Sequence, residues 1–402
     1  MAFRTLRSLE VHGKRVFVRV DFNVPLAADG SVSDDARIVA ALPTLRYLME
    51  KGARLIVASH LGRPKGKRDP RQSLASIRER LERYLRTPVG FAETITGPEA
   101  ERLARSLSDG GVLLLENLRF DPREEANDPE FSRALAALAE SYVNDAFGAA
   151  HRAHASTAGI AAHLADSAAG FLMEREHEAL RRLLESPEPP FVAILGGAKV
   201  SGKIDVLRNL LSRVDRLAIG GGMMFTFLRA MGRGTGRSLV EEDRVPLARE
   251  VLAGAEADRK LLLPGDCLVA KDTSGSDPGR VVAAEAIPAD LMGVDIGPRS
   301  LQAIETMLGS ARTVFWNGPM GVFESPPYAG GTRGVAEAVA RATGRGAFTV
   351  VGGGDSLAAI RKAGLEHKVS HCSTGGGASL EFLEGRTLPG FAALESTAKV
   401  SR

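Results

Sequence analysis

The sequence predicts an α/β protein built of two doubly wound parallel-sheet domains that face a cleft and are joined by a helix hinge. Short apolar, β-branched runs alternate with longer helical patterns along the chain, and this alternation favours parallel pairing of strands. Several of the runs are continuously apolar over four or more residues, which is typical of sheets buried on both faces. A length of 402 residues suits two or three domains.

The first half alternates in this way. Apolar runs predict strands over 15–22, 54–60, 112–117 and 141–147. Helical periodicity predicts helices over 36–51, 74–86 and 129–140. We expect residues 1–171 to form an N-terminal domain.

A charged amphipathic segment, LMEREHEALRRLLES, follows and ends in PEPP. Proline stops a helix because it lacks the amide donor and clashes with the preceding turn. The sequence therefore predicts an interdomain helix and linker over 172–190.

The second half, 191–388, repeats one theme, in which an apolar strand runs into glycines. This occurs at 191–199, 216–224, 313–321, 348–356 and 370–379. Glycine lets backbone amides approach an anion closely, and in an open parallel sheet such turns gather where ligands bind. The repetition predicts a domain that binds a phosphorylated ligand, most naturally a nucleotide.

Two familiar phosphate motifs do not fit this half. GAKVSGKI over 197–204 matches GxxxxGK, but Ile204 replaces the hydroxyl residue that a P-loop needs for magnesium. GxGxxG, the dinucleotide fingerprint, is absent from the sequence. Asp355 directly follows Gly352–Gly354 and is the candidate magnesium ligand. The alternative is that Asp355 caps a helix beginning near Ser356.

In the first half the strand ends carry polar residues: DFN at 21–23, SHLGR at 59–63, ENLRF at 116–120 and NDAF at 144–147, which leads into AHRAHAS. Arg63, Arg119 and Arg152 carry guanidinium groups, whose paired N–H donors suit phosphate or carboxylate oxygens. His151 and His154 either support this site or lie on a helix surface.

Composition excludes several classes of function. A net charge of +3 is too mild for nucleic-acid binding, and the basic stretch at 63–71 is a Pro/Gly-rich loop. Cys267 and Cys372 have neither CxxC spacing nor a disulfide framework, which favours a reducing compartment. The N-terminal segment lacks a signal-peptide apolar region, and no run approaches the ~20 apolar residues of a membrane span. We expect a cytoplasmic protein with no membrane partner.

The residues resemble the phosphoglycerate kinase family over essentially the whole chain. The blocks that carry the resemblance are VRVDFNVPL, SHLGRPKG, VLLLENLRF, VNDAFGAAHRAHAST, GGAKVSGKIDVL, MGVDIGP, VFWNGPMGVFE, VVGGGDS and STGGGASLEFL, in the family's order. The resemblance implies a glycolytic enzyme that moves a phosphoryl group reversibly from 1,3-bisphosphoglycerate to ADP, giving 3-phosphoglycerate and ATP, with Mg²⁺. It also implies a monomer whose tail, 389–402, packs on the N-terminal domain.

The resemblance carries site residues onto this chain. It implies that the acid is bound by Asp21, Phe22, Asn23, Arg37, His60, Leu61, Gly62, Arg63, Arg119 and Arg152. It implies that the nucleotide is bound by Lys199, Lys203, Gly293, Glu324, Gly353, Gly354, Asp355 and Ser356, with Asp355 holding the metal. Catalysis would fall to Arg37, Lys203, Gly354 and Gly376, the last within the Gly375–Gly377 turn.

The chemistry agrees with this residue set. The attacking oxygen is already ionised at neutral pH, so the enzyme needs cations and amides rather than a general base. Arg37 and Lys203 are the expected transition-state cations, although Lys203 could instead be a solvated residue in a helix turn. Because the acid and nucleotide residues lie on opposite sides of the linker, we expect hinge closure when both substrates are bound. The alternatives are another small-acid or sugar kinase, or a non-catalytic two-domain anion-binding protein.

Overall fold

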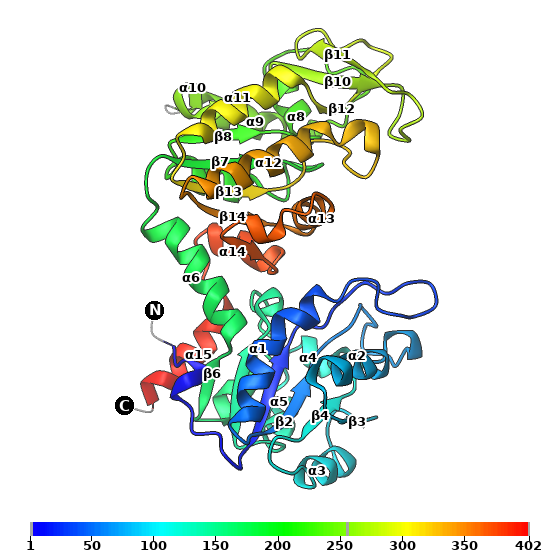
Figure 1. Cartoon of the computed structure of the whole chain (residues 1–402), viewed down its shortest axis with the longest axis vertical. Helices are drawn as coiled ribbons and strands as arrows, with labels where there is room; N and C mark the ends of the chain where they lie inside the picture. The colour runs from blue at the N-terminus through cyan, green and yellow to red at the C-terminus, as the bar shows by residue number, and fades with distance from the viewer. Residues whose placement is uncertain (1–2, 255–256, 401–402) are drawn as a thin grey trace. The chain divides into compact units, whose positions relative to one another are not determined.

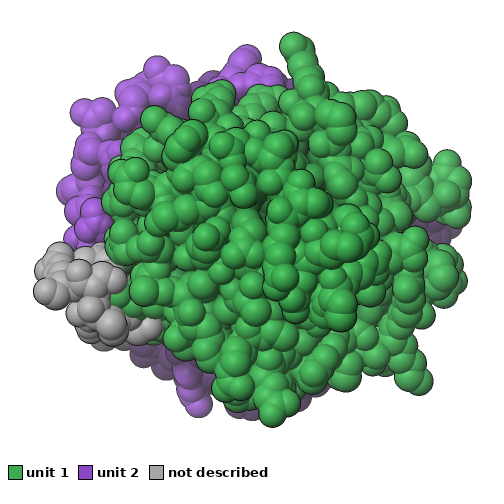
Figure 2. Space-filling view, turned by 90° about the horizontal axis from the view of Figure 1, so that it is seen from below, with its two compact units in different colours: residues 1–178, 387–402 green, residues 179–386 purple. Residues whose placement is uncertain are grey.

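The computed structural model describes residues 3–254 and 257–400 (Figure 1). The chain divides into two compact units, which Figure 2 colours separately. Unit 1 comprises Met1–Glu178 with Thr387–Arg402, and unit 2 comprises Ala179–Arg386. Each unit contains a six-stranded parallel sheet, so the predicted α/β class is confirmed.

The sheet of unit 1 has the strand order β3-β4-β2-β1-β5-β6, and all neighbouring strands in it are parallel. Its strands are β1 (Arg15–Val20), β2 (Arg54–Ala58), β3 (Val89–Ala92), β4 (Val112–Leu115), β5 (Ser141–Asp145) and β6 (Ser167–Ala169). Strands β4 and β5 are buried at every position, because both faces of the sheet are covered. The sequence did not predict the short β3 and β6.

The helices of unit 1 are α1 (Ala36–Glu50), α2 (Ala75–Leu85), α3 (Pro98–Arg105), α4 (Pro122–Glu125), α5 (Pro129–Ala136), the start of α6 (Phe171–Glu185) and α15 (Pro389–Val400). Helices α3 and α4 were not predicted, whereas α1, α2 and α5 match the predicted ones to within four residues. Helix α5 shows why: Asp128 caps it by accepting from the Phe131 amide at 2.8 Å, and Pro129 occupies the first helical position. Helix α15, red in Figure 1, lies against β6, and the Gly390 amide donates to the Ala150 carbonyl.

The sheet of unit 2 has the order β15-β14-β13-β7-β8-β9, again with parallel pairs. Its strands are β7 (Phe191–Leu195), β8 (Arg216–Ile219), β9 (Leu261–Leu262), β13 (Thr313–Asn317), β14 (Phe348–Gly352) and β15 (His371–Ser373). The helices are α7 (Ile204–Leu211), α8 (Met223–Ala230), α9 (Val245–Ala253), α10 (Ala257–Lys260), α11 (Pro298–Gly309), α12 (Gly330–Gly344), α13 (Gly354–Lys362) and α14 (Gly377–Leu383).

Unit 2 also holds a three-stranded antiparallel sheet that the sequence did not predict. Its order is β11 (Arg280–Ala283), β10 (Asp266–Ala270) and β12 (Met292–Ile296). Strand β11 is largely exposed, and the β10–β12 register shifts between Leu268 and Val269. A short, half-exposed strand and a bulge leave little periodic signal.

Strand order defines where each sheet can bind a ligand. In unit 1, β1 and β5 are neighbours, but their next strands, β2 and β6, lie on opposite sides of them. In unit 2, β7 and β13 stand in the same relation, with β8 and β14 as the next strands. Open parallel sheets bind ligands beyond such switch points, because the loops diverge there. We call these the β1–β5 and β7–β13 switch points.

In the described part of the chain, no helix has both the length and the apolar character needed to cross a membrane.

Candidate active site

The loop after β1 begins the cluster of unit 1. Arg37, near the start of α1, donates through Nη1 to Asp21 Oδ1 at 3.2 Å and to the Asn23 carbonyl at 3.0 Å. Burial would raise the pKa of the Asp21 carboxyl, but Arg37 and other neighbouring cations outweigh burial and lower it. Asp21 is therefore a carboxylate that holds Arg37 beside the switch point.

Hydrogen bonds connect the loops after β2 and β4 to the loop after β1. Asn23 Oδ1 accepts from the Gly62 amide at 2.9 Å, and the Gly62 carbonyl accepts from Arg119 Nη1 at 2.7 Å. Arg119 is only 5% exposed. Its Nε lies 3.3 Å from Glu125 Oε1 but makes no hydrogen bond within the described residues, because the direction is poor. Arg119 is thus held by one carbonyl and one carboxylate, and its charge lies close to that of Arg152, so the pair suits the binding of an anion.

The loop after β5 completes the cluster, and it places the two histidines left open by the sequence. His154 is buried, so it does not lie on a helix surface. Burial, together with Arg19, Arg119 and other cations, lowers the pKa of His154 to about 3. His151 accepts at Nε2 from Arg152 Nε at 3.1 Å, which orients that half-buried guanidinium.

Three predicted residues contribute differently from the rest. The side chains of Phe22 and Leu61 lie in the hydrophobic core. The backbone amide and carbonyl of Leu61 both bond to Asn117, at 3.2 and 2.8 Å. Arg63 is exposed and forms no side-chain hydrogen bond or ion pair with the rest of the described chain. The structure thus gathers Asp21, Asn23, Arg37, His60, Gly62, Arg119 and Arg152, and leaves Arg63 in solvent.

Lys203 lies at the β7–β13 switch point of unit 2. Its Nζ donates to the Gly196 carbonyl at 2.6 Å and to the Asn317 carbonyl at 3.1 Å, at the ends of β7 and β13. Burial lowers the pKa of Lys203 to about 8, with the Asp355 charge opposing it. The alternative of a solvated lysine is wrong, because a solvated ammonium makes no such contacts. Lys199, on the same loop, is exposed.

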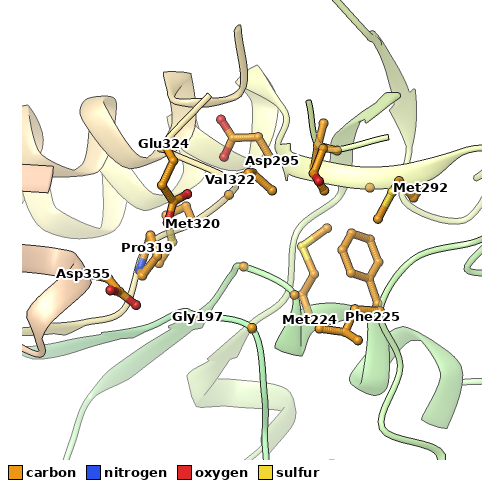
Figure 3. Close-up of a pocket in the computed structure, with 18 residues that line it drawn as sticks. Gly197, Met224, Phe225, Met292, Asp295, Pro319, Met320, Val322, Glu324 and Asp355 are labelled. Atoms are coloured by element: carbon orange, nitrogen blue, oxygen red, sulfur yellow. The ribbon is translucent and has the colours of Figure 1, made fainter. Parts of the chain in front are cut away.

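A pocket of about 360 Å³ opens beside Lys203. Its lining includes Gly293, Glu324 and Asp355, three of the residues predicted to bind the nucleotide. Figure 3 shows Glu324 and Asp355 on one side and the apolar Met224, Phe225 and Met292 on the other. Phe225 packs so closely on Gly293 that a Cβ there would clash with the ring. A planar apolar group and a polar chain could thus be held in one pocket.

The glycine turn after β14 carries Asp355 into this pocket. Helix α13 begins at Gly354, with Gly353 as the N-cap residue at a φ of 90°, a conformation that favours glycine. Asp355 is inside the first turn and makes no side-chain cap bond, so the alternative of an N-cap is wrong. Ser356 is buried instead, and its Oγ accepts from the Gly318 amide. Gly376, also at positive φ, precedes α14 in the same way.

Sequence reasoning missed several pocket residues. Asp295 follows no glycine turn, yet it lines the pocket and accepts from the Gly331 and Ile296 amides at 2.6 and 2.9 Å. Burial raises the pKa of Asp295 to about 7. Asn317 Nδ2 is buried without a hydrogen-bond partner among the described residues, close to Gly353. The apolar MMF that follows Gly220–Gly222 was the one available signal, because a strand-end glycine turn seldom leads into three large apolar residues.

Both switch points present cations and backbone amides, and the described residues place no Ser–His or Cys–His pair at either one. Charge stabilisation without a nucleophile and base is the arrangement of a phosphotransferase. A family model described as phosphoglycerate kinase matches residues 6–386. The chain belongs to the phosphoglycerate kinase family, and it is accordingly a kinase of glycolysis.

Individual relatives agree with the family model. The chain is 57% identical over 395 residues to a phosphoglycerate kinase of Moorella thermoacetica, covering 98% of this chain and 99% of the relative. It is 55% identical over 395 residues to one of Chlorobium luteolum, covering 98% and 100%. Among solved structures, phosphoglycerate kinases from Coxiella burnetii and Pyrococcus horikoshii OT3 each give a TM-score of 0.87. Their identities are 41% and 35%, and coverage is at least 98% of each chain.

Proposed function

We propose that unit 1 binds 3-phosphoglycerate or 1,3-bisphosphoglycerate, that unit 2 binds ADP or ATP with Mg²⁺, and that the phosphoryl group passes between them. The observation that carries this assignment is the contrast between the two switch points. The one in unit 1 is an arginine-rich cluster in which the buried Arg119 lies close to the charges of Arg152 and Arg19. The one in unit 2 is a pocket that is apolar on one side and carries carboxylates on the other.

In unit 1, Arg119 and Arg152 supply forked donors for the oxygens of the acid. Both lie close enough for each charge to act on the other, so an anion between them would relieve their repulsion. Arg37 is held by Asp21 at the edge of this cluster. We assign Arg37 to the transferring phosphoryl group, together with the Gly376 amide.

In unit 2, Met224, Phe225 and Met292 form the wall for the nucleotide base, with Gly293 allowing close packing. Glu324 is placed to accept from ribose hydroxyls. Lys199, Lys203 and the amides of Gly353–Ser356 would bind the phosphates, because the positive end of α13 favours negative charge.

Asp355 fits the part of a magnesium ligand. No group of three or more His, Cys, Asp or Glu that could hold a metal occurs among the described residues. Mg²⁺ does not need such a cage, because it commonly takes one or two carboxylates and completes its shell with waters and substrate phosphates. Asp355 is exposed and lines the pocket. Bound there, Mg²⁺ would neutralise nucleotide phosphate charge.

The residues of this chain then have three tasks: to orient two anions, to exclude water, and to neutralise the charge of the moving group. Lys203 is pre-positioned for the third by its two carbonyl contacts. Neither substrate oxygen needs deprotonation, which agrees with a site free of a general base.

A substrate panel tests this proposal. ATP formation from ADP should be rapid with 1,3-bisphosphoglycerate and at least ~100-fold slower with acetyl phosphate or carbamoyl phosphate, which lack the second phosphate that unit 1 would hold. The Lys203→Met enzyme serves as the blank. Comparable rates with the smaller acyl phosphates would favour a different small-acid kinase. Tight binding of both substrates without turnover would favour an anion-binding protein.

A further inference from the structure

A buried carboxylate lies next to the arginine cluster and was assigned no part in it. Glu124, in α4, is 0% exposed. Its Oε1 accepts from Ser156 Oγ at 2.5 Å, and its Oε2 accepts from the Ser156 amide at 3.0 Å. The Glu124 carbonyl also accepts from the Ala155 amide at 3.0 Å. Glu124 thereby fixes the loop that carries Arg152.

Arg19 links this carboxylate to His60. Arg19 is 0% exposed, and it is the last residue but one of β1. Its Nε donates to Ser156 Oγ at 2.8 Å, and its Nη2 lies 3.1 Å from His60 Nδ1. Ser156 Oγ accepts a hydrogen bond from Arg19 Nε and donates one to Glu124 Oε1. The direction of each hydrogen bond in this network is therefore fixed.

The order of donors determines the state of His60. A guanidinium has five N–H donors and no acceptor, so His60 Nδ1 must be the acceptor. The ring proton is then on Nε2. Asp21 Oδ1 is 3.9 Å from Nδ1, which is too far for a hydrogen bond and leaves Arg19 as the partner.

The surrounding charges agree with a neutral ring. Burial, reinforced by Arg19, Arg119 and Arg37 and opposed by Asp21, holds the pKa of His60 well below its usual value. His60 Nε2 has no hydrogen-bond partner among the described residues. A neutral His60 therefore presents one N–H donor and adds no positive charge.

We propose that Glu124, Ser156 and Arg19 are positioning residues that lock His60 in the Nε2–H tautomer, so that His60 donates a hydrogen bond to an anionic oxygen of the acid substrate. This proposal rests on the assignment of the acid to unit 1. Glu124 and Asp21 both interact electrostatically with Arg19, and Glu124 is the one of the two that is linked to it through Ser156. Arg19 itself touches no substrate in this scheme.

The test combines a spectroscopic and a kinetic readout on the full-length enzyme. Histidine labelled with ¹⁵N gives long-range ¹H–¹⁵N correlations that identify the tautomer of each ring, and His60→Gln assigns the His60 signals. Without substrate, wild-type His60 should be neutral with its proton on Nε2. Glu124→Gln and Ser156→Ala should give a mixture of tautomers. KM for 3-phosphoglycerate should rise about tenfold or more, while KM for ATP changes less than twofold.

Controls separate positioning from general damage. Glu130→Gln makes the same substitution at an exposed residue of α5 and should change neither readout. Glu124→Asp keeps the charge and should recover part of the wild-type tautomer. If Glu124→Gln does not fold, Ser156→Ala carries the test, because it removes only the hydroxyl link.

Two results would overturn the proposal: a wild-type His60 that is an imidazolium or has its proton on Nδ1, or a Ser156→Ala enzyme with an unchanged tautomer and unchanged KM. The tautomer is read without substrate, so it stands apart from the proposed function. An Nε2–H His60 in an enzyme that fails to bind 3-phosphoglycerate would refute the substrate assignment and, with it, the role given to His60 as a donor.

Discussion

Lys203→Met removes the charge at the β7–β13 switch point and keeps an unbranched side chain of similar length. In the wild type, Nζ donates to the carbonyls of Gly196 and Asn317. A cation that acts on the moving phosphoryl group stabilises the transition state more than either ground state. We therefore expect kcat to fall by about 10³–10⁵, the range known for comparable cations in phosphoryl transfer. Each KM should change much less.

The same substitution predicts a pH-dependent difference in stability. The pKa of Lys203 is about 8 in the folded protein, against 10.5 for an ordinary lysine. Between these values the unfolded chain holds a proton that the folded protein has lost, so stability rises with pH. This contribution is fully present above the unfolded pKa and is lost as pH falls through about 8. At about 1.4 kcal/mol per pH unit, the free energy of unfolding of the wild type should rise by about 2–3 kcal/mol relative to that of Lys203→Met between pH 7 and pH 10.

Steady-state kinetics and urea unfolding at pH 7 and pH 10 measure both effects. Lys368→Met, which changes an exposed lysine of the same unit, is the control and should affect neither. A kcat within tenfold of the wild type would remove Lys203 from catalysis. A stability difference that is equal at both pH values would show that its ammonium is not desolvated.

Three further predictions follow from the same contacts. Asp355→Asn should raise the Mg²⁺ concentration needed for half-maximal rate and leave 3-phosphoglycerate binding unchanged, and equal activity at every Mg²⁺ concentration would contradict the metal assignment. Burial raises the pKa of Asp295 to about 7, so the stability that its protonated form provides is present below pH 3.8 and lost as pH rises through 7. Between pH 4 and pH 7, the free energy of unfolding of Asp295→Asn, measured by urea titration, should therefore rise by about 3–4 kcal/mol relative to that of the wild type. Free energies of unfolding that change with pH in parallel for the two proteins would refute this. Because in-line transfer requires reacting atoms within ~3–3.5 Å, small-angle scattering should show a lower radius of gyration with both substrates than with either one, and identical curves from an active enzyme would exclude closure.

The sequence predicted the parts of the fold that repeat a strong local pattern. Buried strands such as β4 and β7 are apolar at every position, and the glycine turns that follow several strands of unit 2 mark the ligand edge of the sheet. Strands β3, β6 and β9 are only 4, 3 and 2 residues long, so their periodicity could not be read. The antiparallel sheet was missed for a different reason, since every residue of β11 is at least partly exposed and leaves little hydrophobic pattern.

The sequence also identified side chains at loop ends but not the buried partners that orient them. Arg19 looks like an interruption in an apolar strand, and nothing local pairs it with Ser156, which is 137 residues away. Glu124 is one of two adjacent glutamates in a short helix, and only the fold shows that it is buried while Glu125 is exposed. Such pairs depend on strand order, which a single sequence does not contain.

The central claim is that each substrate has its own unit, and isothermal titration calorimetry of two single variants tests it most directly. Arg152→Ala should weaken 3-phosphoglycerate binding about tenfold or more, since one charge-assisted contact contributes about 1.5–3 kcal/mol, and should leave ADP binding unchanged. Glu324→Ala should weaken ADP binding and leave 3-phosphoglycerate binding unchanged. The opposite pattern, or a loss of both ligands in either variant with its fold intact, would contradict the claim.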